Sequence, residues 1–356
     1  MRFPTTLALL GTAAAIAFTS PAAAQEKQTF KVGYVVYVGF MPLAYMKAEG
    51  LMDAWGEKYG IDVELIQIND YVGSINQFIA GDLDAVAVAG MDALTMPAAG
   101  GVDTSIFLVT DYSNGNDALL SRSVDSVEAL LDDEVYLLQY SVSHYLLNRA
   151  LAEAGIDEPW RVKTVNISDA EIGAAFITQD SMNHAASWNP IVAEMLDQVP
   201  ESKVLFDSSQ IPGEIMDVFI ARTDTLAEHP EFGKAVTGAW YEAMAVMQGE
   251  EAKDGPMHEI MASAMGTDLA GFAGQADQTH FFYTPGDAAA FLSADSSVEI
   301  MDKVRTFSFD EGLFGAGAAS VDEIGIEVGG NTLGDPGNVK LRFDASFAEM
   351  AAAGDI

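Results

Sequence analysis

Acidic, amide and aromatic side chains recur where the predicted strands end, and together they could bind a small polar ligand. Tyr37 and Phe40 follow the first predicted strand, Asn69 and Asp70 follow the second, and Asp92 follows the third. Ligands of open α/β sheets bind beyond the carboxyl ends of the strands, so one cleft could hold these side chains together. Later strand ends complete the predicted ligand-binding set, which also contains Asp111, Asp117, Tyr140, Ser141, Trp188, Asn189 and Asp217.

The chemistry of this set favours a neutral amide-like ligand or a cation. Carboxylates form charge-assisted hydrogen bonds with N–H groups, and aromatic faces attract cations. A sulfonate or carboxylate ligand would need Arg, Lys or open helix N-termini. Among the nearby basic residues only Arg122 is a candidate for such a contact, and its position favours a hinge or surface role.

Each of these residues also has a purely structural interpretation. Asp70 and Asp92 are residue types that cap helix N-termini. Tyr37, Phe40 and Trp188 could belong to a hydrophobic core. A binding site explains the group better, because its members recur at successive strand ends in both halves of the chain.

Catalytic and metal-binding signals are absent from the sequence. The chain has 0 Cys, and its 5 His are scattered without the spacing of a metal site. It contains neither a Gly-x-x-x-x-Gly-Lys-Ser/Thr phosphate-binding loop nor a Gly-x-Ser-x-Gly nucleophile motif. We therefore expect no cofactor and no enzymatic activity. The net charge of -36 repels phosphate backbones and anionic lipids, so we expect no nucleic-acid binding.

Strand and helix patterns alternate along the first third of the chain. Strands are predicted over 30–38, 61–68, 84–89 and 104–110, and helices over 42–59 with an interruption at Gly50, over 71–80 and over 92–99. The same alternation follows, with helices over 125–131, 141–154, 169–178 and 190–199 and strands over 134–139, 162–166, 184–188 and 204–207. This pattern predicts an α/β fold with mainly parallel sheets.

The chain is predicted to form two lobes and to cross between them twice, near residues 111–122 and again near residues 208–217. Residues 1–24 have the basic start, apolar centre and small-residue end of a secretory signal peptide. We then expect the first part of lobe 1 over 25–115 and lobe 2 over 116–215. Residues 216–356 would return to lobe 1 and add a C-terminal helical extension. The expected product is an exported, soluble, periplasmic monomer that is not embedded in a membrane.

Several segments resemble a known family of transport proteins. They include YVGFMP at 37–42, GMDALT at 90–95, DYSNGND at 111–117 and SWNP at 187–190. These segments are similar to nitrate/sulfonate/taurine-type ABC transporter periplasmic proteins, and to the subgroup found beside urea carboxylase genes. The likeness covers essentially the whole chain after residue 24. The sequence departs from the family pattern at Tyr140, because a smaller or aliphatic residue is expected at that position.

This resemblance implies a type II periplasmic-binding-protein fold, with two α/β lobes joined by a hinge. It also implies a permease and an ATPase as partners, and urea or a guanidine-like solute as the ligand. Taurine, another sulfonate or a pyrimidine precursor is the alternative ligand. An enzyme of pyrimidine-precursor synthesis is the alternative of a different class.

Overall fold

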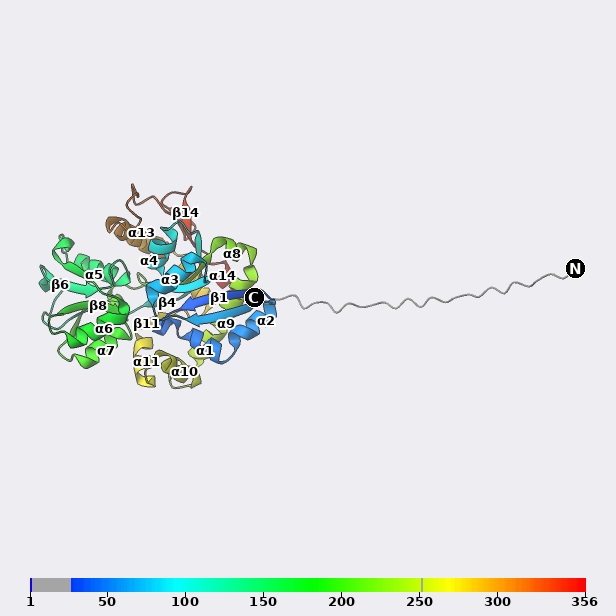
Figure 1. Ribbon diagram of the computed structural model, residues 1–356, viewed down its shortest axis with the longest axis horizontal. Helices are drawn as coiled ribbons and strands as arrows, with labels where there is room; N and C mark the ends of the chain where they lie inside the picture. Colours follow the sequence, from blue (N-terminus) through cyan, green and yellow to red (C-terminus); the bar gives the residue numbers. More distant parts are fainter. Residues whose placement is uncertain (2–26, 251) are drawn as a thin grey trace.

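Two mixed β-sheets form the centres of two lobes (Figure 1). The computed structural model describes residue 1 and residues 27–250 and 252–356, so the predicted signal peptide lies outside the described residues apart from Met1. The strands of lobe 1 are β1 (Thr29–Tyr34), β2 (Asp62–Gln67), β3 (Ala85–Ala89), β4 (Thr104–Ser113), β10 (Met216–Arg222), β11 (Thr279–Phe281), β12 (Gly325–Val328), β13 (Asn331–Leu333) and β14 (Val339–Phe343). Those of lobe 2 are β5 (Asp117–Ser121), β6 (Glu134–Leu137), β7 (Lys163–Asn166), β8 (His184–Trp188) and β9 (Lys203–Asp207).

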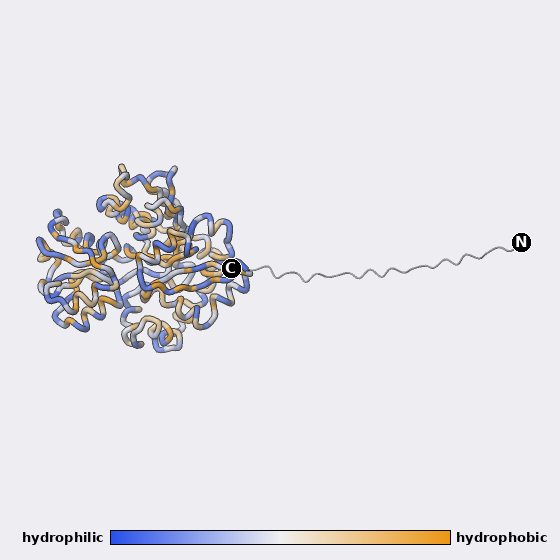
Figure 2. Tube along the Cα trace, viewed as in Figure 1, coloured by the Kyte–Doolittle hydropathy of each residue, from blue (hydrophilic) through white to orange (hydrophobic). Residues whose placement is uncertain are grey.

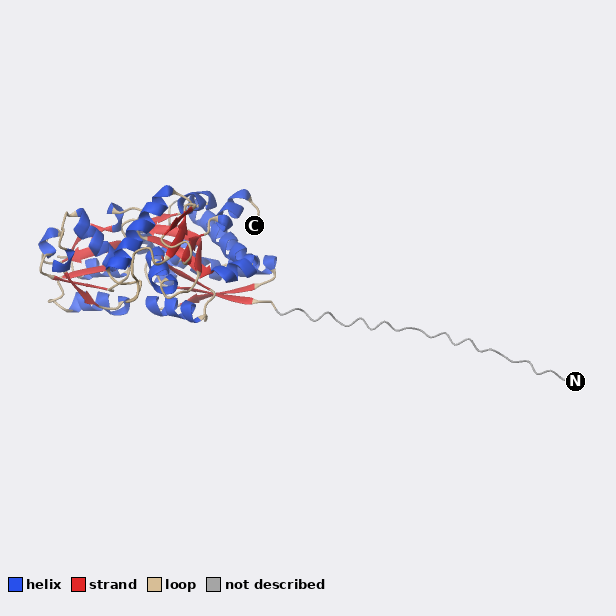
Figure 3. Ribbon diagram, turned by 90° about the horizontal axis from the view of Figure 1, so that it is seen from above, coloured by secondary structure: helices blue, strands red, loops and turns tan. Residues whose placement is uncertain are grey.

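The sheet of lobe 1 has the order β13-β12-β14-β4-β10-β3-β1-β2, and β11 pairs with β4. All five residues of β3 are buried, because this apolar strand lies inside the sheet and helices cover both faces (Figure 3). The helices of this lobe are α1 (Pro42–Ala48), α2 (Leu51–Tyr59), α3 (Tyr71–Ala80), α4 (Gly90–Ala93), α8 (Thr223–Glu228), α9 (Pro230–Gly249), α10 (Pro256–Met265), α11 (Leu269–Asp277), α12 (Pro285–Leu292), α13 (Asp295–Asp310) and α14 (Ser346–Ala353).

Lobe 2 is a three-layer unit around the order β7-β6-β8-β5-β9. Its helices are α5 (Val142–Glu153), α6 (Asp169–Thr178) and α7 (Ile191–Gln198). Successive strand residues point to opposite faces. Ala118 and Leu120 of β5 therefore pack with residues of α6 and α7, whereas Leu119 packs in the core that includes residues of α5. Figure 2 shows these strands as apolar segments inside more polar surroundings.

The prediction of mainly parallel sheets is wrong at the strands beside the lobe boundary. β10 is antiparallel to both β3 and β4, and β5 is antiparallel to both β8 and β9. β5 and β10 are the first strands after each passage between the lobes. A chain that enters a sheet from the other lobe can run opposite to the strands already there. Local sequence patterns carry no information about that direction.

Several predicted elements differ in extent. The first strand ends at Tyr34, so Tyr37 lies in a loop before a single turn at Val38–Phe40. The predicted helix 92–99 is α4 followed by a wider turn at Leu94–Ala98, and the predicted helix 125–131 is only a short turn at Glu128–Leu130. The predicted crossing over 111–122 contains β5. The C-terminal part adds strands β11 to β14 as well as helices.

Residues 114–116 and 208–215 connect the lobes, and we call them the crossover segments. They are hydrogen bonded together, because the Ser208 hydroxyl contacts the Ser113 hydroxyl at 2.7 Å and accepts from the Gly115 N–H at 2.7 Å. Gly115 has a φ of +124°, a conformation that L side chains rarely adopt, so a larger residue there would be strained. We propose that the lobes divide near the sequence limits given above, at these segments.

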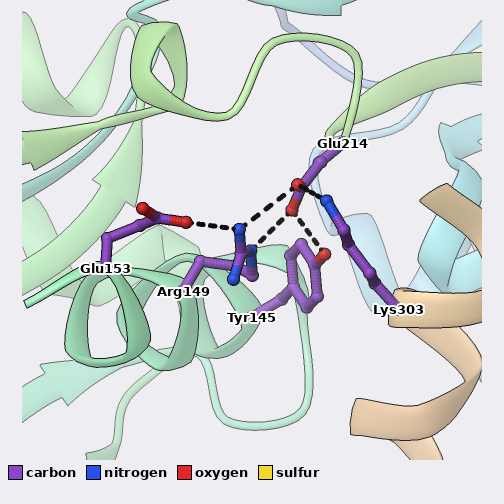
Figure 4. Close-up of polar contacts among 5 residues, drawn as sticks. All are labelled: Tyr145, Arg149, Glu153, Glu214 and Lys303. Atoms are coloured by element: carbon purple, nitrogen blue, oxygen red, sulfur yellow. Dashed lines mark hydrogen bonds and ion pairs between the residues drawn. The ribbon is translucent and has the colours of Figure 1, made fainter. Parts of the chain in front are cut away.

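Glu214 joins the second crossover segment to both lobes (Figure 4). Its carboxylate accepts hydrogen bonds from the Tyr145 hydroxyl and from Nε of Arg149, each at 2.7 Å, and both donors belong to α5 of lobe 2. Lys303, on α13, contacts the other carboxylate oxygen at 2.7 Å. Burial alone would raise the pKa of Glu214, but the hydrogen bonds from Lys303, Tyr145 and Arg149 outweigh it and lower the pKa.

None of the described helices is long and apolar enough to cross a membrane.

Candidate ligand-binding site

A small cavity lies between the two lobes, next to the crossover segments. Its cavity volume is about 30 Å³. A single water needs roughly 10–15 Å³ of such volume, so the cavity fits a ligand of few heavy atoms. The lining residues are Val35, Tyr37, Phe40, Tyr71, Ala89, Asp117, Val142, Trp188, Ile215 and Asp217.

Strand pairing positions the acidic residues of the site. Because β10 lies between β3 and β4, Asp217 pairs with Ala89 on one side and with Asp111 on the other. In lobe 2, Asp117 of β5 pairs with Trp188 of β8. Directly opposed residues in antiparallel strands have neighbouring side chains on one face. The two sheets therefore place the carboxyl groups of Asp217, from lobe 1, and Asp117, from lobe 2, at the cavity. The Trp188 indole lies beside Asp117.

Two further carboxyl groups lie behind the lining and are held by tyrosines. The Tyr71 hydroxyl donates to Oδ2 of Asp92 at 2.6 Å and accepts from the Ala89 N–H at 3.0 Å. The Tyr37 hydroxyl donates to Oδ1 of Asp111 at 3.3 Å. Oδ2 of Asp111 accepts from the Thr110 hydroxyl at 2.8 Å. These hydrogen bonds fix the two tyrosine rings that face the cavity.

The site is strongly acidic and shielded from water. Burial raises the pKa of Asp92, Asp111 and Asp117 from 3.8 to about 7. The pKa of Asp217 is raised well above 3.8 by burial and by the charges of Asp111 and Asp117. No Lys, Arg or His is among the described residues that line the cavity. Near neutral pH these four carboxyl groups are therefore partly protonated, and a bound cation would displace their protons.

These pKa shifts predict that the ligand-free protein loses thermal stability as the pH rises from about 4 to about 7. The unfolded chain ionises Asp92 near pH 3.8, whereas the folded chain keeps it protonated until about pH 7, so rising pH favours unfolding across this interval. A shift of this size in one carboxyl corresponds to about 4 kcal/mol. Scanning calorimetry from pH 4 to 8 measures the effect. Asp92→Asn should have a flatter profile than the parent, and identical slopes would contradict the prediction.

Aromatic rings from both lobes surround the cavity. The rings of Tyr71, from lobe 1, and Trp188, from lobe 2, have centroids 5.9 Å apart. Tyr37 and Phe40 pack edge to face with centroids 5.2 Å apart. Faces of this kind attract cations, most strongly when water is excluded. The cavity thus combines carboxyl groups with π-faces.

The structure brings together part of the predicted ligand-binding set. Tyr37, Phe40, Asp117, Trp188 and Asp217 line the cavity. Asp92 and Asp111 are buried directly behind it and contact two of the tyrosines of the lining.

Other predicted residues lie away from the cavity or have structural partners. Asn69 and Asp70 are exposed, and Asp70 caps α3 by accepting from the Gly73 N–H at 2.9 Å. Ser141 caps α5 and donates to the Leu138 carbonyl at 2.8 Å.

Asn189 and Tyr140 complete the predicted set. The buried Asn189 amide donates to Oδ1 of Asn116 at 2.9 Å and to Oε1 of Gln278 at 2.8 Å. Tyr140 is 49% exposed and packs edge to face against His144. Tyr140 is not among the residues that line the cavity.

Tyr71 is not in the predicted ligand-binding set, although it directly follows Asp70 at the end of a predicted strand. Its place in the first turn of α3, rather than the cap position before it, turns its ring toward Asp92 and Trp188. Val142 and Ile215 also line the cavity, and an apolar residue beside a crossover carries no distinguishing signal in one sequence. Within the described residues, no group of three or more His, Asp or Glu could hold a metal ion.

Solved structures with the same fold include proteins that bind anions. The alkanesulfonate-binding protein SsuA from Xanthomonas axonopodis pv. citri, bound to MOPS, is 15% identical with a TM-score of 0.65, covering 82% of this chain and 95% of that chain. The periplasmic aliphatic sulphonate binding protein SsuA from Escherichia coli is 17% identical with a TM-score of 0.63, covering 80% and 88%. The periplasmic nitrate-binding protein NrtA from Synechocystis PCC 6803 is 15% identical with a TM-score of 0.57, covering 92% and 99%.

These similarities confirm the predicted two-lobed α/β periplasmic-binding-protein fold. No curated protein sequence matches the chain. The predicted urea-carboxylase-associated subgroup stays a prediction. The sequence model of the NMT1-like family matches residues 23–262, which is more than half of the 356 residues. The chain therefore belongs to the NMT1-like family.

Proposed function

We propose that this protein is the substrate-binding component of an ABC importer, and that its ligand is a small nitrogen-containing cation of the guanidinium type. A cavity between two hinged lobes suits a protein that closes around its ligand and presents both lobes to a permease. Other proteins with the same fold are named as a ligand-binding component of an ABC-type import system and as the binding protein of a sulfonate ABC transporter, and these names support the transport role. A permease and an ATPase are the partners that this role requires.

One observation carries the choice of ligand: the cavity is lined by Asp117 and Asp217, is backed by two more buried carboxyl groups, and has no basic residue among its described lining. Buried charges are favourable only when they are paired and hydrogen bonded. An anion in this cavity would add repulsion, whereas a cation would neutralise the cluster. The electrostatics therefore favour a ligand opposite in charge to sulfonate and nitrate.

The same cavity favours guanidinium over urea and over larger cations. Its volume suits a ligand of few heavy atoms. Guanidinium is planar, carries N–H donors on every edge and can lie against an aromatic face while it donates to carboxylates. Urea has a similar shape but no charge, and a quaternary ammonium ion lacks N–H donors.

A thermal-shift screen of the protein without residues 1–24 tests this proposal. A ligand that binds only the folded state raises the melting temperature. We expect a rise with millimolar guanidinium chloride at pH 8, a smaller rise with urea, and no specific rise with taurine, nitrate or a pyrimidine precursor. Sodium chloride at equal ionic strength is the control. A rise with taurine or nitrate alone would overturn the cation assignment, and turnover of any of these compounds would overturn the binding-protein role.

Export to the periplasm belongs to the same proposal. It rests on the signal-peptide pattern of residues 1–24 and on the periplasmic proteins of the same fold. N-terminal sequencing of the exported protein should give a chain that starts at Gln25.

A further inference from the structure

The carboxyl groups around the cavity differ in how many hydrogen bonds they already accept. Asp92 is held by the Tyr71 hydroxyl, and both oxygens of Asp111 accept from hydroxyl groups, those of Tyr37 and Thr110. Asp117 is only 3% exposed, and no donor among the described residues reaches its Oδ1 atom. A buried, unpartnered charged oxygen is costly unless a ligand supplies the donor.

Asp117 also differs from the others in its place in the fold. It is the first residue of β5 in lobe 2, whereas Asp92, Asp111 and Asp217 belong to lobe 1. Asp117 lines the same cavity as Asp217, from the opposite lobe. In addition to burial, its charge raises the pKa of all three of those carboxyl groups. Like charges on the two sides of one cavity oppose the approach of the lobes. A cation between them would convert that repulsion into attraction.

The backbone of Asp117 is hydrogen bonded to a residue next to the crossover segments. Its N–H donates to the hydroxyl of Ser113, the last residue of β4, at 3.0 Å, and that hydroxyl contacts Ser208 of the second crossover segment. Because residues 114–116 directly precede β5, a rotation of lobe 2 about the crossover segments moves the Asp117 carboxylate relative to Asp217. Trp188, its partner across β5 and β8, moves with it.

We propose that Asp117 is the residue that selects a cation over a neutral ligand of the same shape and couples that choice to closure of the lobes. Its free Oδ1 accepts an N–H of a planar, hydrogen-bond-donating monocation, while Asp217 of lobe 1 neutralises the opposite edge. A neutral ligand such as urea can fill the cavity but leaves the two carboxylates repelling each other. This inference rests on the proposed function and adds which residue enforces it.

Titration calorimetry of the parent protein and Asp117→Asn with guanidinium chloride and with urea at pH 8 tests the assignment. Asparagine keeps the shape and the backbone hydrogen bond but removes the charge. Guanidinium affinity should fall about 100-fold or more, as for loss of one partner of a buried charge pair. Urea affinity should change by less than about tenfold, because only one neutral hydrogen bond is altered. Small-angle scattering should show compaction by guanidinium in the parent protein but not in the variant.

The controls separate the possible causes of failure. Asp157→Asn removes one exposed charge from lobe 2 and should bind like the parent. The ligand-free melting temperature of Asp117→Asn should not fall, since the substitution removes a buried like charge, and this excludes misfolding. If the parent protein prefers guanidinium and Asp117→Asn keeps that preference, the assignment of Asp117 is wrong while the proposed function stands. If the parent protein binds no cation, both are wrong.

Discussion

Replacing Trp188 with alanine should weaken guanidinium binding about 30-fold while leaving the fold intact. The indole lines the cavity, lies 5.9 Å from the Tyr71 ring between centroids, and is only partly buried. A cation held against an aromatic face away from water gains about 2 kcal/mol or more, which corresponds to the expected loss. Titration calorimetry at pH 8 measures the affinity.

Two further variants serve as comparisons for this prediction. Trp188→Phe keeps an aromatic face and should lose less affinity than Trp188→Ala. Trp160→Ala removes an indole that is 72% exposed on the same lobe, and its affinity should equal that of the parent protein. Equal losses in Trp188→Ala and Trp160→Ala, or an unchanged affinity in Trp188→Ala, would contradict the role of the indole. Ligand-free melting curves show whether each variant is folded.

Replacing Glu214 with alanine should destabilise the protein by about 3 kcal/mol, a typical cost of breaking a buried ion pair on one side. The Glu214 side chain is 6% exposed and contacts Arg149, Lys303 and the Tyr145 hydroxyl. Its removal leaves Arg149, whose side chain is 18% exposed, without its main partner. The crossover segment would also lose its connections to α5 and α13 (Figure 4).

Calorimetric melting measures this effect, with an expected fall of about 5 °C in the melting temperature. Chemical denaturation with urea or guanidinium is unsuitable, because both are candidate ligands. Glu153→Ala is a matched control: Glu153 pairs with the same Arg149 at 2.8 Å but is 53% exposed, so its loss should cost less than about 1 kcal/mol. Similar melting temperatures for the two variants would show that the contacts of Glu214 across the crossover segment do not stabilise the folded protein.

Much of the secondary structure could be predicted because its signals are local. The helices 71–80 and 169–178 and the strand 184–188 begin and end where apolar spacing and capping residues predict. The strand Thr29–Tyr34 is shorter than predicted, because an apolar aromatic run continues into the loop that carries Tyr37. Periodicity cannot tell a strand from a buried loop of the same composition.

The acidic and aromatic character of the candidate site follows from the sequence, but the set of residues that line the cavity does not. Asp70 and Tyr71 are adjacent and follow the same strand, yet Asp70 caps α3 at the surface while Tyr71 reaches Asp92. A strand end indicates which edge of the sheet a residue occupies. It does not indicate whether the side chain points into the cleft, since that depends on how the following helix begins.

The sequence by itself determined the α/β lobes, the absence of cysteine and metal-binding spacing, and the acidic and aromatic character of the candidate site. Only the tertiary structure decided that Asp117 and Asp217 meet at one cavity and that Glu214 joins α5 to α13. The reason is physical: hydrophobic periodicity and capping act within a few residues. The direction of β5 and β10, and hence which side chains converge, depends on contacts between segments far apart in the chain.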